Sequence, residues 1–155
     1  MKIEKAKNID NIKLSELTVL SKSHWNYSQE QIEKWKNDLT ISPEYINKNE
    51  VYKLKEDDKL IGYYAFQLVD YKKVKLDNIF IDPEFIGRGY GKILMKHFFK
   101  QIKNKGFENI YLESDPHAKK FYQKLGFKVI GQLESSIKNR FLPIMELKIT
   151  QISTL

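Results

Sequence analysis

The spacing of hydrophobic positions changes repeatedly along the chain, and each change predicts a strand or a helix. Several segments show the alternation or the short apolar run typical of a strand. They span residues 2–7, 51–54, 60–69, 74–81, 110–112, 127–133 and 143–150. Apolar residues recur at helical spacing over residues 9–20, 28–39, 90–106 and 114–125. The order β-α-α-β-β-β-α-β-α-β-β predicts an α/β (α+β) fold, with a mixed, mostly antiparallel sheet and helices on both faces.

Local signals add detail to this order. Ser28 is placed to cap the second helix, and residues 41–44 can open one more short turn. The Asp-Asp pair at 57–58 predicts the turn of a hairpin between two strands. Strand–helix–strand crossovers over residues 74–112 and 110–133 predict local parallel pairing inside the sheet.

The size and composition are those of one ordinary globular domain. A chain of 155 residues can bury one core, so we expect a single domain over residues 1–155. Its apolar runs are far too short for a membrane span, and its N-terminus has no apolar segment before a cleavage site. These features predict a cytoplasmic protein without membrane contact.

The net charge and the small number of possible metal ligands limit which partners and cofactors the protein is expected to bind. The net charge of +7 favours anionic partners, but it comes from lysines spread along the chain, which favours a solvated surface over nucleic-acid binding. The absence of cysteine excludes disulfides, thiolate metal sites and a cysteine nucleophile. His24, His97 and His117 lie far apart in sequence, so we expect no metal.

The sharpest motif is a glycine-rich loop at residues 86–91, between a predicted strand and a predicted helix. Free backbone N–H groups and the positive end of a helix dipole converge at such a junction, which favours an anion. A Walker A loop needs four residues between its glycines, whereas three separate Gly87 from Gly91. A dinucleotide fingerprint would need a glycine where Lys92 stands.

The loop resembles the pyrophosphate-binding motif of the GNAT superfamily of N-acetyltransferases, Gln/Arg-x-x-Gly-x-Gly/Ala. Gly89 and Gly91 occupy its glycine positions, while Ile86 stands where the family usually has Gln or Arg. Residues 76–84 are similar to the strand and turn before this loop in the family. Residues 118–127 are similar to its second common motif, so the resemblance is close over residues 76–127.

The resemblance implies a fold, an activity and a co-substrate. It implies transfer of an acetyl group from acetyl-CoA to a small-molecule or peptide amine by direct attack on the thioester, and it is compatible with a homodimer. Strands 74–81 and 110–113 would splay apart to accept the pantetheine arm. The residues implied to hold acetyl-CoA are Phe80, Ile81, Ile86, Gly87, Arg88, Gly89, Tyr90, Gly91, Lys92, Asp115, Ala118 and Phe121.

The same resemblance suggests catalytic residues. Tyr122 corresponds to the family tyrosine that protonates the leaving thiolate, although a tyrosine on an apolar stripe is more often a core residue. The amine must lose a proton before it attacks, and Asp77 is the nearest acid to the loop on its own strand. Glu113, on the neighbouring strand, is a second candidate base. Either acid could equally be a paired or solvated charge.

Candidate acceptor-binding residues lie near both ends of the chain. Trp25 and Tyr27 fall between the two early helices, which wall the acceptor site in the family. Arg140 lies with Phe141 in the predicted last hairpin loop, and its planar guanidinium suits a carboxylate. Core packing would explain Trp25 equally well. An acyl-CoA-binding regulatory module without turnover is the alternative function, because Ile86 departs from the family pattern.

Overall fold

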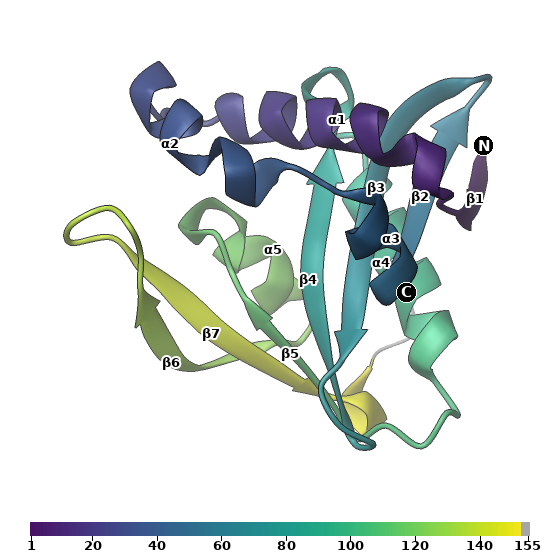
Figure 1. Ribbon diagram of the computed structural model, residues 1–155. Coiled ribbons are helices and arrows are strands. Elements are labelled where there is room, and N and C mark those ends of the chain that lie inside the picture. Colours follow the sequence, from purple (N-terminus) through teal and green to yellow (C-terminus); the bar gives the residue numbers. More distant parts are fainter. Residues whose placement is uncertain (153–155) are drawn as a thin grey trace. The chain divides into compact units, whose positions relative to one another are not determined.

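The structure is a computed structural model that describes residues 1–152 (Figure 1). Its strands form one sheet in the order β1-β2-β3-β4-β5-β7-β6. The strands are β1 (Lys2–Lys5), β2 (Glu50–Glu56), β3 (Lys59–Leu68), β4 (Lys73–Ile81), β5 (Asn109–Glu113), β6 (Lys128–Glu134) and β7 (Phe141–Lys148). The α-helices are α1 (Asn11–Ser23), α2 (Gln29–Leu39), α3 (Pro43–Lys48), α4 (Tyr90–Ile102) and α5 (Lys119–Lys124). This arrangement confirms the predicted fold class and order, with α3 added where the sequence indicated a short turn.

The described chain divides into two compact units, and β3, β4 and α4 contribute to both of them. One unit contains residues 1–66 and 78–98, and the other contains, among the described residues, 67–77 and 99–152. No helix within residues 1–152 is long and apolar enough to cross a membrane.

In the first unit, β1, β2 and β3 pair antiparallel, and two adjacent tyrosines of β3 show how helices cover the sheet. The Tyr63 hydroxyl hydrogen bonds the Thr18 hydroxyl of α1, while the Tyr64 ring packs on Phe98 of α4 at 5.5 Å. Successive residues of a strand point to opposite faces. The first unit therefore has α1 on one face of its strands and α4 on the other.

Local sequence signals explain several boundaries in this unit. The Ser28 hydroxyl accepts the Gln31 N–H, so it caps α2 as predicted. Asp57 and Asp58 both have positive φ, at 51° and 37°, which is the conformation of the tight turn expected between β2 and β3. The sequence predicted the first helix from five apolar residues, but the structure buries only two of them. Leu14 and Leu17 are buried, whereas Ile9, Ile12 and Leu20 are exposed.

The second unit contains the parallel pairing. Residues 73–75 of β4 pair in parallel with residues 109–111 of β5, which confirms the first predicted crossover. The second crossover does not produce a pair, because β7 lies between β5 and β6 and pairs antiparallel with both. The last strand also differs from its predicted bounds. It begins at Phe141, so Phe141 belongs to β7 and not to the hairpin loop.

Candidate functional site

The glycine loop lies between β4 and α4, as the sequence predicted. Asp82 caps the short turn η2 (Pro83–Phe85) by accepting the Glu84 N–H at 2.9 Å. After this turn, Gly87 and Gly89 adopt φ values of 84° and 85°, which L side chains rarely reach. A Cβ added at either glycine would meet no atom within 4 Å. The loop therefore needs glycine for its backbone conformation, and both positions face open space.

Helix α4 begins at Tyr90, within the motif of residues 86–91. The Gly89 carbonyl accepts the first helical hydrogen bond, from the Ile93 N–H at 3.2 Å. By helix geometry, the N–H groups of the first turn, from Tyr90 to Lys92, have no acceptor within the helix. They point out of its N-terminus, where the dipole favours negative charge. Gly91 differs from the other two glycines because it lies within the helix.

Aromatic and charged side chains flank the loop. The Phe85 ring lies 5.1 Å from Lys59 Nζ and 5.3 Å from Arg88 Cζ, so two cations lie over one ring. Lys59 also pairs with Glu84 at 2.6 Å. The Tyr90 hydroxyl donates to Glu56 at 3.0 Å. Through these contacts, residues of the β2–β3 hairpin hold the loop in place. The sequence did not indicate these contacts.

Gly62 lets the end of β4 lie close to β3. A Cβ at Gly62 would come within 2.7 Å of the Phe80 carbonyl oxygen and of Ile81 Cδ1. The Asp82 N–H continues this contact by donating to the Ile61 carbonyl at 2.8 Å. Gly62 therefore helps to place Phe80 and Ile81, the last two residues of β4. Its position inside a predicted strand was the available signal.

The two candidate bases lie close to one lysine. Lys75 Nζ is 3.5 Å from Asp77 Oδ1 and 3.7 Å from Glu113 Oε1, and all three side chains are partly buried. The parallel register sets Lys75 opposite Tyr111, whose hydroxyl donates to Glu113 at 2.6 Å. That hydrogen bond raises the pKa of Tyr111 to about 12. The sequence identified both acids but missed Lys75 and Tyr111.

The burial pattern of β4 changes at this cluster. Val74 and Leu76 are buried in strict alternation, but no residue from Asp77 to Ile81 is buried. Within the described residues, the parallel register with β5 ends at Lys75 and Tyr111, although both strands continue. The second half of β4 therefore differs from the first in burial as well as in pairing.

Tyr122 has a buried ring and an accessible hydroxyl. The ring makes edge contacts with Phe121 and Phe127, with centroids 5.2 and 5.6 Å away. The hydroxyl makes no hydrogen bond to the described residues, and every fully buried side-chain polar atom among them has a partner. The hydroxyl oxygen therefore reaches solvent. Burial, and secondarily the charge of Asp115, raise the pKa of Tyr122, so the phenol keeps its proton at neutral pH.

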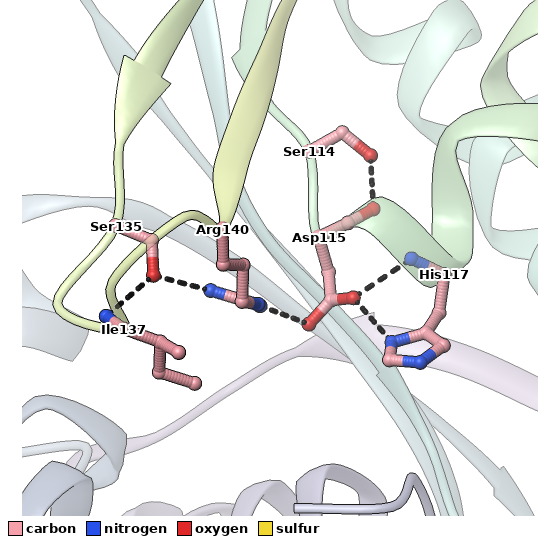
Figure 2. A network of polar contacts seen from close by, with 6 residues as sticks. All are labelled: Ser114, Asp115, His117, Ser135, Ile137 and Arg140. Carbon is pink, nitrogen blue, oxygen red and sulfur yellow. Dashed lines mark hydrogen bonds and ion pairs between the residues drawn. The ribbon is translucent and has the colours of Figure 1, made fainter.

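Asp115 lies at the centre of a polar network (Figure 2). It caps the turn η3 (Pro116–Ala118), which leads into α5, by accepting the His117 N–H at 2.9 Å. The same carboxylate oxygen faces His117 Nδ1 at 2.8 Å. The other oxygen accepts Arg140 Nη2 at 3.1 Å. The structure thus joins Asp115, predicted to bind cofactor, to Arg140, predicted to bind acceptor.

The early aromatic residues lie where α1 meets α2. Tyr27 packs edge-on against Trp35 of α2 at 4.9 Å, and Lys22 Nζ lies 5.4 and 5.2 Å from those two rings. Trp25 makes a similar edge contact with His24 at 5.0 Å. Trp25 and Tyr27 are both partly buried. Tyr27 thus belongs to an aromatic pair with Lys22 over it, while Trp25 packs against His24.

A glycine loop that leads into a helix N-terminus has a geometry suited to an anion such as a phosphate. A sequence model of the Acetyltransferase (GNAT) domain matches residues 24–149. The chain belongs to the GNAT acetyltransferase family.

Relatives with assigned activities agree with this membership. The ribosomal protein bS18-alanine N-acetyltransferase of Salmonella typhimurium is 31% identical over 94 residues, which cover 59% of this chain and 60% of that protein. The corresponding Haemophilus influenzae protein is 33% identical over 93 residues and has the same coverage. The chain thus spans about 60% of the length of these curated relatives.

A solved structure matches over nearly the whole chain. The PaiA N-acetyltransferase of Thermoplasma acidophilum, crystallised in complex with coenzyme A, has a TM-score of 0.78 and 26% sequence identity. The match covers 95% of this chain and 98% of that one. The fold of this chain is therefore that of a protein that binds coenzyme A.

Proposed function

We propose that this protein transfers an acetyl group from acetyl-CoA to an amine by direct attack of the amine on the thioester. The observation that carries the proposal is the backbone of the glycine loop, with left-handed Gly87 and Gly89 before the free first turn of α4. Family membership and the coenzyme A complex of the PaiA relative support it. When bound, acetyl-CoA supplies the acetyl group as an activated thioester.

The loop is suited to hold the pyrophosphate. A side chain at Gly87 or Gly89 would occupy the open space beside the loop, so glycine leaves the backbone accessible to an anion. Ile86, Gly87, Arg88, Gly89, Tyr90, Gly91 and Lys92 are the proposed pyrophosphate-binding residues. Phe80 and Ile81 would bind the thioester region, and Asp115, Ala118 and Phe121 would complete the cofactor site.

The proposed chemistry moves two protons. Asp77 takes a proton from the acceptor amine as its nitrogen bonds to the thioester carbonyl carbon, and the carbon–sulfur bond breaks. Tyr122 gives its phenolic proton to the thiolate that leaves. Its raised pKa and its accessible, unbonded hydroxyl support this role, because a general acid must hold its proton at the working pH.

The acceptor is proposed to be a small-molecule or peptide amine. The curated relatives include enzymes named for ribosomal protein alanine and for peptidyl-lysine. Trp25 and Tyr27 are proposed to contact the acceptor, while the sequence-based hypothesis that Arg140 binds an acceptor carboxylate is tested below against a second role for this residue. We further propose that residues 1–155 act as one domain in the cytoplasm, as a monomer or homodimer.

An acceptor panel tests the proposal. Purified protein with acetyl-CoA would be given an alanine-initiated peptide, a lysine peptide, a short diamine and an aminoglycoside, with thiol release as the measured rate. We expect turnover on at least one amine and a coenzyme A-dependent rise in melting temperature. Absence of coenzyme A binding would overturn the loop assignment. Binding without turnover on any amine would favour the alternative suggested by Ile86, an acyl-CoA-binding regulatory module.

A further inference from the structure

Arg140 connects two segments that are distant in sequence. Its Nη2 donates to Asp115 Oδ2 at 3.1 Å, and its Nη1 donates to the Ser135 hydroxyl at 2.9 Å (Figure 2). Only 15% of the Arg140 side chain and 19% of the Asp115 side chain are exposed. An ion pair shielded to this extent is screened less by salt than a surface pair.

The β6–β7 loop is closed by its own hydrogen bonds. The Ser135 N–H donates to the Arg140 carbonyl at 3.0 Å, and the Arg140 N–H donates to the Ile137 carbonyl at 3.1 Å. The Ser135 hydroxyl also accepts the Ile137 N–H at 3.0 Å. Because Arg140 closes this loop and reaches Asp115, the loop is joined to η3 through one side chain.

Asp115 is fixed on its other side as well. Its carboxylate caps η3, and its carbonyl accepts the hydroxyl of buried Ser114 at 2.7 Å. The Ser114 N–H donates to the Pro143 carbonyl of β7 at 2.8 Å. Tyr122 follows on α5, which continues directly from η3. The position of Asp115 therefore sets the start of the segment that carries Tyr122.

We propose that Asp115 and Arg140 act together as a positioning pair, which fixes the Tyr122 segment and the β6–β7 loop in one arrangement. The inference rests on the proposed acetyl transfer and assigns Arg140 a different role from binding an acceptor carboxylate. Asp115 neutralises the guanidinium, so a carboxylate on the acceptor gains little from it. Acceptor amines with and without a carboxylate should therefore depend on Arg140 equally.

The kinetic test uses Asp115→Asn, Arg140→Gln and the double variant. Asparagine can still cap η3, so Asp115→Asn removes the charge and keeps the cap. We expect each single variant to lower kcat about tenfold on matched acceptors with and without a carboxylate, with KM values little changed. The double variant should be no slower than the singles. Lys72→Gln, which breaks the exposed Lys72–Glu108 pair of the same unit, is the control and should leave kcat unchanged.

Three kinetic outcomes would overturn the proposal. Independent effects that multiply in the double variant would show that the two residues do not act together. A rise in acceptor KM confined to Arg140→Gln and to carboxylate-bearing acceptors would make Arg140 an acceptor ligand. A rise in the acetyl-CoA KM confined to Asp115→Asn would make Asp115 a direct cofactor ligand.

Amide hydrogen exchange tests the pair without turnover, so its failure is separate from failure of the acetyltransferase assignment. Both single variants should speed exchange in residues 116–122 and in residues 135–140, because each residue holds both segments. Faster exchange in only the mutated segment would overturn the proposal even if the wild-type protein acetylates nothing on the panel.

Discussion

The Tyr111 hydroxyl donates to Glu113 on the same strand, with 2.6 Å between the two oxygens. Lys75 approaches the same carboxylate oxygen at 3.7 Å and also lies 3.5 Å from Asp77. One oxygen of Glu113 thus already faces two donors. Both candidate bases thus lie beside Lys75, and we keep Asp77 as the proposed base because it lies on the strand that leads into the glycine loop.

Asp77→Asn should therefore reduce turnover more than Glu113→Gln. We expect Asp77→Asn to lower kcat about 10²-fold, the lower end of the range for general base catalysis, with coenzyme A affinity unchanged. Glu113→Gln should cost less than tenfold. Steady-state thiol release on the best acceptor measures both rates, and the reverse order would transfer the base role to Glu113.

Tyr122→Phe separates packing from proton donation. The substitution keeps the buried ring and removes a hydroxyl that has no hydrogen bond to the described residues, so folding and coenzyme A affinity should change little. We expect kcat to fall by about 10² or more. Because burial and Asp115 raise the pKa of Tyr122, loss of its proton should not limit the wild-type rate up to pH 9. A wild-type rate in a folded variant would leave Tyr122 a core residue only.

Gly89→Ala tests whether the loop binds the pyrophosphate, and Gly106→Ala is its matched control. Both glycines have positive φ, at 85° and 86°, and a Cβ at either would meet nothing within 4 Å. Each substitution should cost about 1 kcal/mol of stability through backbone strain alone. Calorimetry should show coenzyme A affinity reduced at least tenfold in Gly89→Ala only. Equal affinities in the two variants would contradict the loop assignment.

Asp10→Asn should destabilise the folded protein in a pH-dependent way. Burial would raise the pKa of Asp10, but hydrogen bonds from Lys53 and the Lys7 N–H outweigh it, so the folded-state pKa is lowered. A lowered pKa contributes stability above the unfolded-state pKa, and this stability is lost as pH falls through the folded-state pKa. We expect a loss of about 1–2 kcal/mol at pH 7, because the pair is largely shielded.

Urea unfolding at pH 7 and near pH 2 measures this effect. The difference between Asp10→Asn and wild type should shrink at the lower pH, where Asp10 itself becomes protonated. Glu30→Gln removes an exposed pair with Lys34 at 3.8 Å and should change stability by less than about 0.5 kcal/mol at either pH. A pH-independent loss in Asp10→Asn would mean that the charge of Asp10 is not the cause.

The sequence by itself determined the features that depend on neighbouring residues. The order of strands and helices follows from hydrophobic spacing, because buried residues recur at a different interval in a strand than in a helix. The turn at Asp57 and Asp58 and the cap at Ser28 were both predicted. Each depends on backbone conformations or hydrogen bonds within a few residues.

Only the tertiary structure decided the features that depend on pairing between distant segments. The sequence contains no local signal that places β7 between β5 and β6. Hydrophobic spacing predicts where a strand lies in the sequence, but not which strand it pairs with after the chain turns back. The partners of Arg140 could not be predicted for the same reason. The local sequence around an arginine does not show whether its side chain contacts solvent, a substrate or Asp115. The sheet arrangement and closure of the β6–β7 loop bring these two side chains together.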